Sequence, residues 1–66
     1  MKITVNGESR AVERATTVAA LLDLLKVDYR AAAVEVNREL VPRSRHAAHA
    51  LNEGDAVEIV TLVGGG

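Results

Sequence analysis

The three consecutive glycines Gly64, Gly65 and Gly66 are the part of this sequence whose residue types and spacing suggest chemistry. Glycine has no Cβ, so consecutive glycines let a backbone thread a narrow channel or approach a ligand closely. The α-carboxyl of Gly66 is ionised at neutral pH and is a poor electrophile. A nucleotide-dependent partner could convert it to an acyl-adenylate, and a sulfur donor could then displace AMP and leave a thiocarboxylate. This chemistry needs no side chain from the small protein.

The side-chain composition excludes several other classes of function. There is no cysteine, so a disulfide framework, a cysteine-based zinc site and a thiol nucleophile are ruled out. Tyr29 is the only aromatic residue, which argues against binding of nucleic acid by base stacking. The net charge of −1 creates no strong field toward nucleic acid or a membrane surface. Residues 1–7 lack the hydrophobic core of a signal peptide, so we expect a cytoplasmic protein. No glycine-rich loop has Walker or Rossmann spacing, and we expect no bound cofactor.

Two polar clusters lie in the stretch 38–49. His46 and His49 have helical i, i+3 spacing and could share a metal, but two imidazoles without a third ligand make a weak site. We therefore expect solvated or partly packed histidines and no metal. The neighbouring arginines are either a solvated edge or a docking surface for an acidic partner, and the sequence leaves their role open. They are Arg38, Arg43 and Arg45.

The first half of the chain predicts a hairpin followed by a helix. Residues 2–6 alternate polar and apolar, Asn6-Gly7 is a hairpin turn signal, and residues 9–13 form the returning strand with Val12 facing inward. Thr17 is a candidate N-cap for a helix of about ten residues. One face of that helix is apolar at i, i+3, i+4 and i+7, a spacing typical of core packing. Its residues are Val18, Leu21, Leu22 and Leu25.

The second half predicts three further extended segments. Residues 33–37 alternate, 37–39 turn the chain, and 40–42 form a short strand ended by Pro42, which cannot donate a ladder hydrogen bond. A loose helical turn over 43–50 and a turn over 51–55 precede the last strand, 56–63. One helix covers only one face of one sheet, and the last strand pairs in parallel beside the first. The order predicts an α+β fold of the β-grasp (ubiquitin-like) type: a mixed sheet of four to five strands with one main helix across one face.

The last strand is apolar on both faces. Val57 and Ile59 join the helix-facing core formed by Ile3, Val5, Val34 and Val36, so Val60 and Leu62 point to the face that no helix covers. This pattern fits either a central strand that is apolar on both sides or a partner-docking patch made by Val60 and Leu62. We expect a single domain over residues 1–66, in which 64–66 form a flexible tail.

The motifs together resemble a known family. The β-grasp order, the tail VGGG, Gly54-Asp55 before VEIV and above all VNRELVPR at 36–43 are similar to the ThiS family of sulfur carriers in thiamine thiazole biosynthesis. The terminal Gly-Gly alone is shared by all ubiquitin-like carriers. Its combination with Asn37, Val41-Pro42-Arg43 and Gly54-Asp55 is much more specific, and the resemblance spans the whole chain.

The resemblance implies a protein co-substrate rather than an enzyme. An adenylating (E1-like) activating enzyme would use ATP and magnesium to activate Gly66, a sulfur-donor system would supply sulfur, and thiazole synthase would receive it. Gly64 and Gly65 would thread the partner's active site, and the free chain would be a monomer. Two other readings stay open: a carrier for molybdopterin or amino-acid synthesis, and a ubiquitin-like modifier joined to target lysines. A third is a binding module whose glycine tail is accidental.

Overall fold

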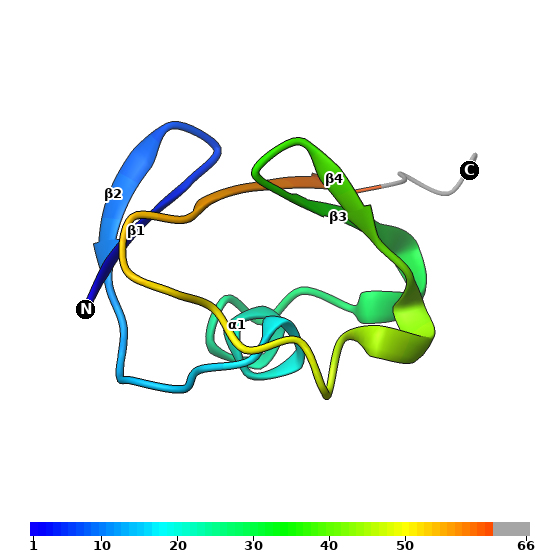
Figure 1. Cartoon of the computed structure of the whole chain (residues 1–66). Coiled ribbons are helices and arrows are strands. Elements are labelled where there is room, and N and C mark those ends of the chain that lie inside the picture. Colours follow the sequence, from blue (N-terminus) through cyan, green and yellow to red (C-terminus); the bar gives the residue numbers. More distant parts are fainter. Residues whose placement is uncertain (62–66) are drawn as a thin grey trace.

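The computed structural model of the chain describes residues 1–61 (Figure 1). The strands in this part are β1 (Lys2–Val5), β2 (Glu8–Ala11), β3 (Ala32–Val36), β4 (Glu39–Val41) and β5 (Ala56–Thr61). The helix α1 spans Val18–Leu24, and two 3₁₀ segments, η1 and η2, span Tyr29–Ala31 and Arg43–Arg45. No helix in residues 1–61 is long and apolar enough to cross a membrane.

The described strands form one mixed sheet in the order β2-β1-β5-β3-β4. β5 runs parallel to β1 and antiparallel to β3, so it occupies the centre of the sheet. Parallel neighbours need a long crossover, and here the chain between β1 and β5 includes α1. Figure 1 shows α1 on one side of the sheet, with no helix on the other. The predicted β-grasp fold, with its central parallel last strand, is confirmed.

The core lies between α1 and one face of the sheet. Of the strand residues predicted to face inward, all except Val12 are buried: Ile3, Val5, Val34, Val36, Val57 and Ile59. Val18, Leu21 and Leu22 fill the space from the helix side, whereas Leu25 is only partly buried against this cluster. Full burial of one such side chain contributes about 1.5–3 kcal/mol. The alternation of the strands and the helical spacing therefore determine which face of each element is covered.

The N-terminus of α1 is held by the chain that leads into β5. The Oγ1 atom of Thr17 accepts a hydrogen bond from the Ala20 N–H at 3.1 Å, which confirms Thr17 as the N-cap. The N–H groups of Val18 and Ala19 donate to the carbonyls of His49 and His46. The N–H groups of the first three helical residues have no acceptor within the helix, and these bonds supply one for each of them. Residues 46–50 are therefore a structural support for the helix.

Replacing Thr17 with alanine tests the cap. We expect Thr17→Ala to lower the free energy of unfolding by about 1 kcal/mol, because the Ala20 N–H loses its acceptor. Urea denaturation followed by circular dichroism measures this change. Thr17→Ser keeps the hydroxyl and is the matched control, so it should retain most of the stability. Equal losses in both variants would show that the threonine methyl, rather than the cap, accounts for the effect.

The helix has seven residues, fewer than the ten or so predicted. It ends because Lys26 adopts a left-handed conformation with φ of 58°. The Lys26 N–H donates to the Asp23 carbonyl and the Val27 N–H to the Leu22 carbonyl. This pair of bonds is the Schellman arrangement, which normally uses glycine at the left-handed position. With lysine there, the sequence gives no signal of the stop.

Three other segments differ from the sequence-based expectation. β2 ends at Ala11, so Val12 lies outside the strand, although it still packs partly against the core. The connector after the helix contains η1, whose N-cap Asp28 accepts a hydrogen bond from the Arg30 N–H. The predicted helical turn over 43–50 is reduced to η2 followed by turns and an isolated bridge between Thr17 and Ala50.

Candidate docking face and the end of β5

β5 is the element that leads toward the glycine tail. Its pairing is continuous with β3 over Ala32–Val36, whereas β1 pairs with it only at Ala56 and Val57. Val60 is the one predicted docking residue in the described part of the chain. Leu62 and the predicted tail residues lie outside the described residues; the latter are Gly64, Gly65 and Gly66.

Asn6 extends the pairing of β5 beyond the end of β1. Its backbone has a positive φ of 51° in the predicted Asn6-Gly7 turn. Its side-chain Oδ1 accepts a hydrogen bond from the Ile59 N–H at 2.7 Å, and its Nδ2 donates to the Ile59 carbonyl at 3.2 Å. The amide therefore replaces a strand partner on one side of β5, close to Val60.

Asn37 plays the matching part on the other side of β5. Its Oδ1 accepts from the Ala56 N–H and its Nδ2 donates to the Asp55 carboxylate, both at 3.0 Å. The buried Asp55 also accepts from the Asn52 N–H at 2.8 Å, which closes the turn before β5. Asn37 and Gly54-Asp55, singled out by the resemblance, thus form one hydrogen-bonded unit. The two asparagines fix β5 at both edges.

The face of the sheet opposite α1, called the open face below, carries exposed apolar side chains. Val60 is 59% exposed, as predicted from the alternation of β5. Leu40 in β4 is 65% exposed, and it lies across β3 from this strand. Leu40 could not be assigned to this face from the sequence, because the short segment Leu40-Val41-Pro42 shows too little alternation. Glu35 and Glu58 lie on the same face, directly opposite each other in the β3–β5 register.

The histidines do not form a metal site in the described residues. His46 is only 5% exposed, so it is buried rather than solvated, and its Nε2 donates to the Val41 carbonyl at 3.1 Å. This bond joins η2 to β4. His49 is partly exposed, and no group of three or more metal-ligating side chains occurs in residues 1–61. His46 therefore contributes to packing, and its Nδ1 has no hydrogen-bond partner among residues 1–61.

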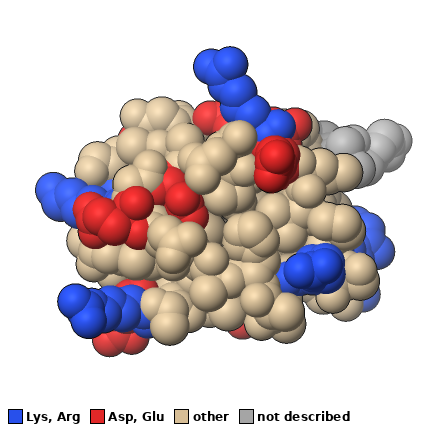
Figure 2. All heavy atoms as spheres, viewed as in Figure 1, with Lys and Arg blue, Asp and Glu red and all other residues tan. Residues whose placement is uncertain are grey.

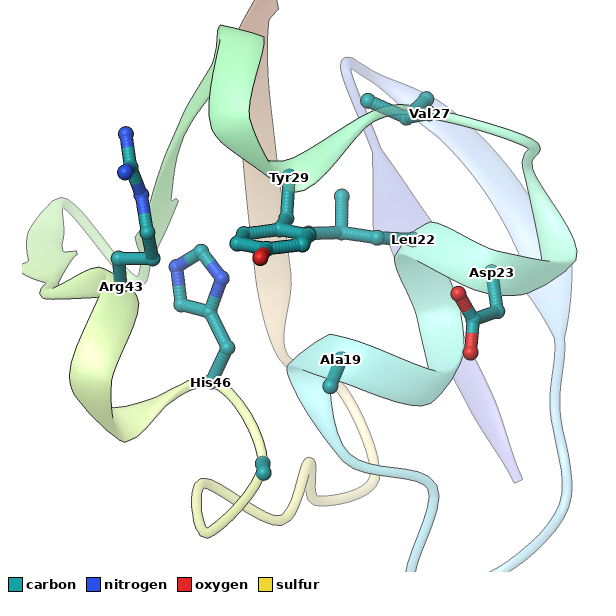
Figure 3. Close-up of a pocket in the computed structure, with 8 residues that line it drawn as sticks. Ala19, Leu22, Asp23, Val27, Tyr29, Arg43 and His46 are labelled. Carbon is teal, nitrogen blue, oxygen red and sulfur yellow. The ribbon is translucent and has the colours of Figure 1, made fainter.

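A cavity of about 320 Å³ lies between α1, η1 and η2, and Figure 3 shows its lining. Leu22 and Val27 provide apolar walls, and His46 forms one side. The half-exposed Tyr29 also lines the cavity, and the Arg43 guanidinium is 5.8 Å from its ring centroid, within reach of a cation–π contact. An Nη2 atom of Arg43 also donates to the Arg30 carbonyl at 3.3 Å. This arginine thus connects η2 to η1, a role that the sequence did not indicate.

The charges on the surface are mixed. The viewed face in Figure 2 shows basic and acidic side chains scattered among uncharged ones, without one large basic patch. Arg30 makes an exposed ion pair with Asp28, and this hydrogen-bonded guanidinium lowers the pKa of the Asp28 carboxyl. Arg38 occupies the β3–β4 turn with a φ of 69°, and Arg45 ends η2. Of the three arginines singled out in the sequence, Arg38 therefore lies in a turn, and Arg43 and Arg45 lie in η2.

Comparison with known proteins places these features in a family. The ThiS family model matches residues 3–66. The chain is 30% identical to the sulfur carrier protein ThiS of Escherichia coli, with all of both chains covered. The crystal structure of a thiamine biosynthesis protein (ThiS) from Geobacter metallireducens superposes with a TM-score of 0.82 at 39% identity, over the full length of both chains.

Longer proteins also contain a similar segment. The chain is 52% identical over its 66 residues to a thiazole synthase of Paramagnetospirillum magneticum. It spans 20% of the length of that protein, and the same share of the thiazole synthase of Magnetococcus marinus. The family match, the full-length relatives and the shared fold confirm the resemblance seen in the sequence: this chain belongs to the ThiS family.

Proposed function

We propose that the chain is a sulfur carrier for thiamine thiazole biosynthesis and that Gly66 carries the sulfur. The observation that carries the proposal is the family match, which runs through the terminal glycines. Two full-length relatives bear the names of a sulfur carrier and a thiamine biosynthesis protein. The similar segment within thiazole synthases supports that enzyme as the acceptor.

The proposed chemistry takes place on the α-carboxylate of Gly66. A carboxylate oxygen attacks the α-phosphorus of ATP, pyrophosphate leaves, and an acyl-adenylate forms. Magnesium held by the activating enzyme neutralises the phosphate charge. Hydrosulfide then attacks the acyl carbon, the C–O bond to AMP breaks, and a thiocarboxylate remains after loss of a proton. The adenylate is needed because the free carboxylate is a poor electrophile.

The small protein contributes binding and reach rather than catalytic groups. Gly64 and Gly65 enter a narrow channel in the partner, since they lack side chains. Val60 and Leu62 dock on the adenylating, E1-like enzyme through the open face. Thiazole synthase is the second partner, and a separate system supplies sulfur. The carrier itself is a cytoplasmic monomer, a single domain and a co-substrate without a bound cofactor.

Intact mass spectrometry tests the carrier chemistry. The chain is incubated with ATP, magnesium, sulfide and a thiazole-pathway activating enzyme, and its C-terminus is then fragmented. We expect a mass gain that corresponds to replacement of one oxygen by sulfur, localised to Gly66. The control reaction omits ATP and should leave the mass unchanged.

Two other results carry different conclusions. An unchanged mass, with an activating enzyme shown to work on another carrier, would contradict the proposed pairing. A thiocarboxylate that thiazole synthase does not accept would keep the carrier chemistry and move the acceptor to another sulfur pathway.

A further inference from the structure

Two carboxylates face each other on the open face. Glu35 in β3 and Glu58 in β5 are direct cross-strand partners, and both are exposed. The Cβ atoms of such partners are about 5 Å apart, and like charges in this position are destabilising. Arg30 and Asp28 form the one ion pair within residues 1–61 whose N and O atoms are at most 4.0 Å apart. Neither glutamate therefore has a cation at that distance. These two residues are called the acidic pair below.

Exposed apolar side chains flank the acidic pair. Leu40 lies directly opposite Glu35 in the β3–β4 register, and Val60 lies two residues beyond Glu58 on the same face of β5. Both are more than half exposed. The surface therefore combines an apolar rim with two negative charges that make no ion pair within residues 1–61. Such a surface is complementary to an apolar patch that presents one cation.

The position of the tail determines which partner reaches this surface. Five residues follow Thr61, and a fully extended chain spans at most about 3.6 Å per residue, so Gly66 lies within about 18 Å of the end of β5. An enzyme that acts on the Gly66 carboxyl must therefore approach the end of β5 closely. Val60 is adjacent to that end, and Glu58 of the acidic pair lies two residues before Val60.

We propose that the acidic pair receives an arginine or lysine of the adenylating partner, within an apolar contact made by Leu40 and Val60. This inference rests on the proposed function. A guanidinium fits best because its planar fork can donate to both carboxylates at once. The partner's cation offsets the repulsion between the two glutamates. Relief of this repulsion on binding makes the free energy of association more favourable.

Charge reversal tests the proposal through the kinetics of activation. The double variant Glu35→Lys/Glu58→Lys should raise the KM for the carrier about 10-fold or more, because like charges then meet across the interface. The kcat should stay unchanged, since the tail is intact. The neutral variant Glu35→Gln/Glu58→Gln should raise KM less. Neither change should lower the melting temperature, because both side chains are exposed. The glutamine variant removes the repulsion of the native pair, and the lysine variant replaces it with a similar one.

A second double variant controls for net charge. Glu8→Lys/Glu13→Lys makes the same change of charge at exposed positions outside β3 and β5. It should leave KM within about 2-fold of wild type, apart from a small effect on long-range steering. An equal rise of KM in both double variants would overturn the docking proposal while the carrier chemistry stands. A wild-type chain that is not activated at all would instead overturn the proposed function, and this inference with it.

Discussion

Removal of Gly66 should abolish formation of the thiocarboxylate without changing the stability of the fold. The deletion moves the terminal carboxyl back by about 3.5 Å along the chain. A misplacement of about 1 Å at a reacting group can cost about 100-fold in rate, so we expect activation to fall by at least that factor. Single-turnover assays of adenylate formation with the activating enzyme, combined with intact mass, measure the loss.

The variant Gly66→Ala separates the position of the carboxyl from the width of the channel. It keeps the length of the chain and adds one methyl group. A strong loss with alanine as well would support a narrow channel that admits glycine alone, whereas near-normal activation would show that length is what counts. Thermal unfolding should match wild type in both variants, because the buried core is made of residues between Ile3 and Ile59. A lowered melting temperature would show that the tail is structural.

The sequence predicted the architecture because its patterns are local. Alternation in 2–6, 33–37 and 56–61 assigned the buried faces correctly, and the amphipathic helix supplied the one covering element. The Asn6-Gly7 turn was predicted from residue type, and a turn over 37–39 was also expected, although Glu39 already belongs to β4. Asn6-Gly7 and Asn37-Arg38 have positive φ at both positions, which is what a two-residue hairpin loop requires.

Features that depend on contacts between distant residues could not be predicted in the same way. Asn6 and Asn37 were identified as turn residues, but their amides also bond to β5 from opposite sides, and nothing in their local sequence indicates this. His46 lies in a stretch without clear periodicity. It is buried because this stretch must lie against the start of α1, where the His46 carbonyl accepts from the Ala19 N–H.

The candidate site was predictable in part. Val60 was placed correctly on the open face from the alternation of β5 alone. The acidic pair could not be predicted. Two glutamates can be recognised as cross-strand partners only when the register of β3 against β5 is known, and spacing in the sequence does not supply that register. The docking role of Leu62 remains a prediction that rests on the alternation of the last strand, and the role of the three glycines remains one that rests on the family match.

Loss of the Asn37 amide should produce a large decrease in stability. Asn37→Gly keeps a residue suited to the positive φ and removes two hydrogen bonds, to Asp55 and to the Ala56 N–H. A bond to a charged group contributes about 1.5–3 kcal/mol and a neutral one about 1 kcal/mol, so we expect a loss of about 2–4 kcal/mol. A domain of this size has roughly 3–10 kcal/mol in total. Urea unfolding at low temperature measures the loss.

The neighbouring residue offers a matched control. Arg38 has a similar positive φ in the same turn, and its side chain is exposed. Arg38→Gly therefore makes the same backbone more flexible without removing an amide, and it should change the free energy of unfolding by less than about 1 kcal/mol. Equal losses in the two variants would show that flexibility of the turn, rather than the amide, accounts for the decrease.

Hydrogen exchange locates the effect along β5. The Ala56 N–H donates to Asn37, whereas the Ile59 N–H donates to Asn6. In Asn37→Gly the Ala56 amide should lose protection beyond the global decrease, while the Ile59 amide should follow the global decrease alone, since its acceptor is retained. Asn6→Gly should reverse this order. If both amides lost protection equally in each variant, the two asparagines would act on β5 as one cooperative unit instead of as separate clamps at its two edges.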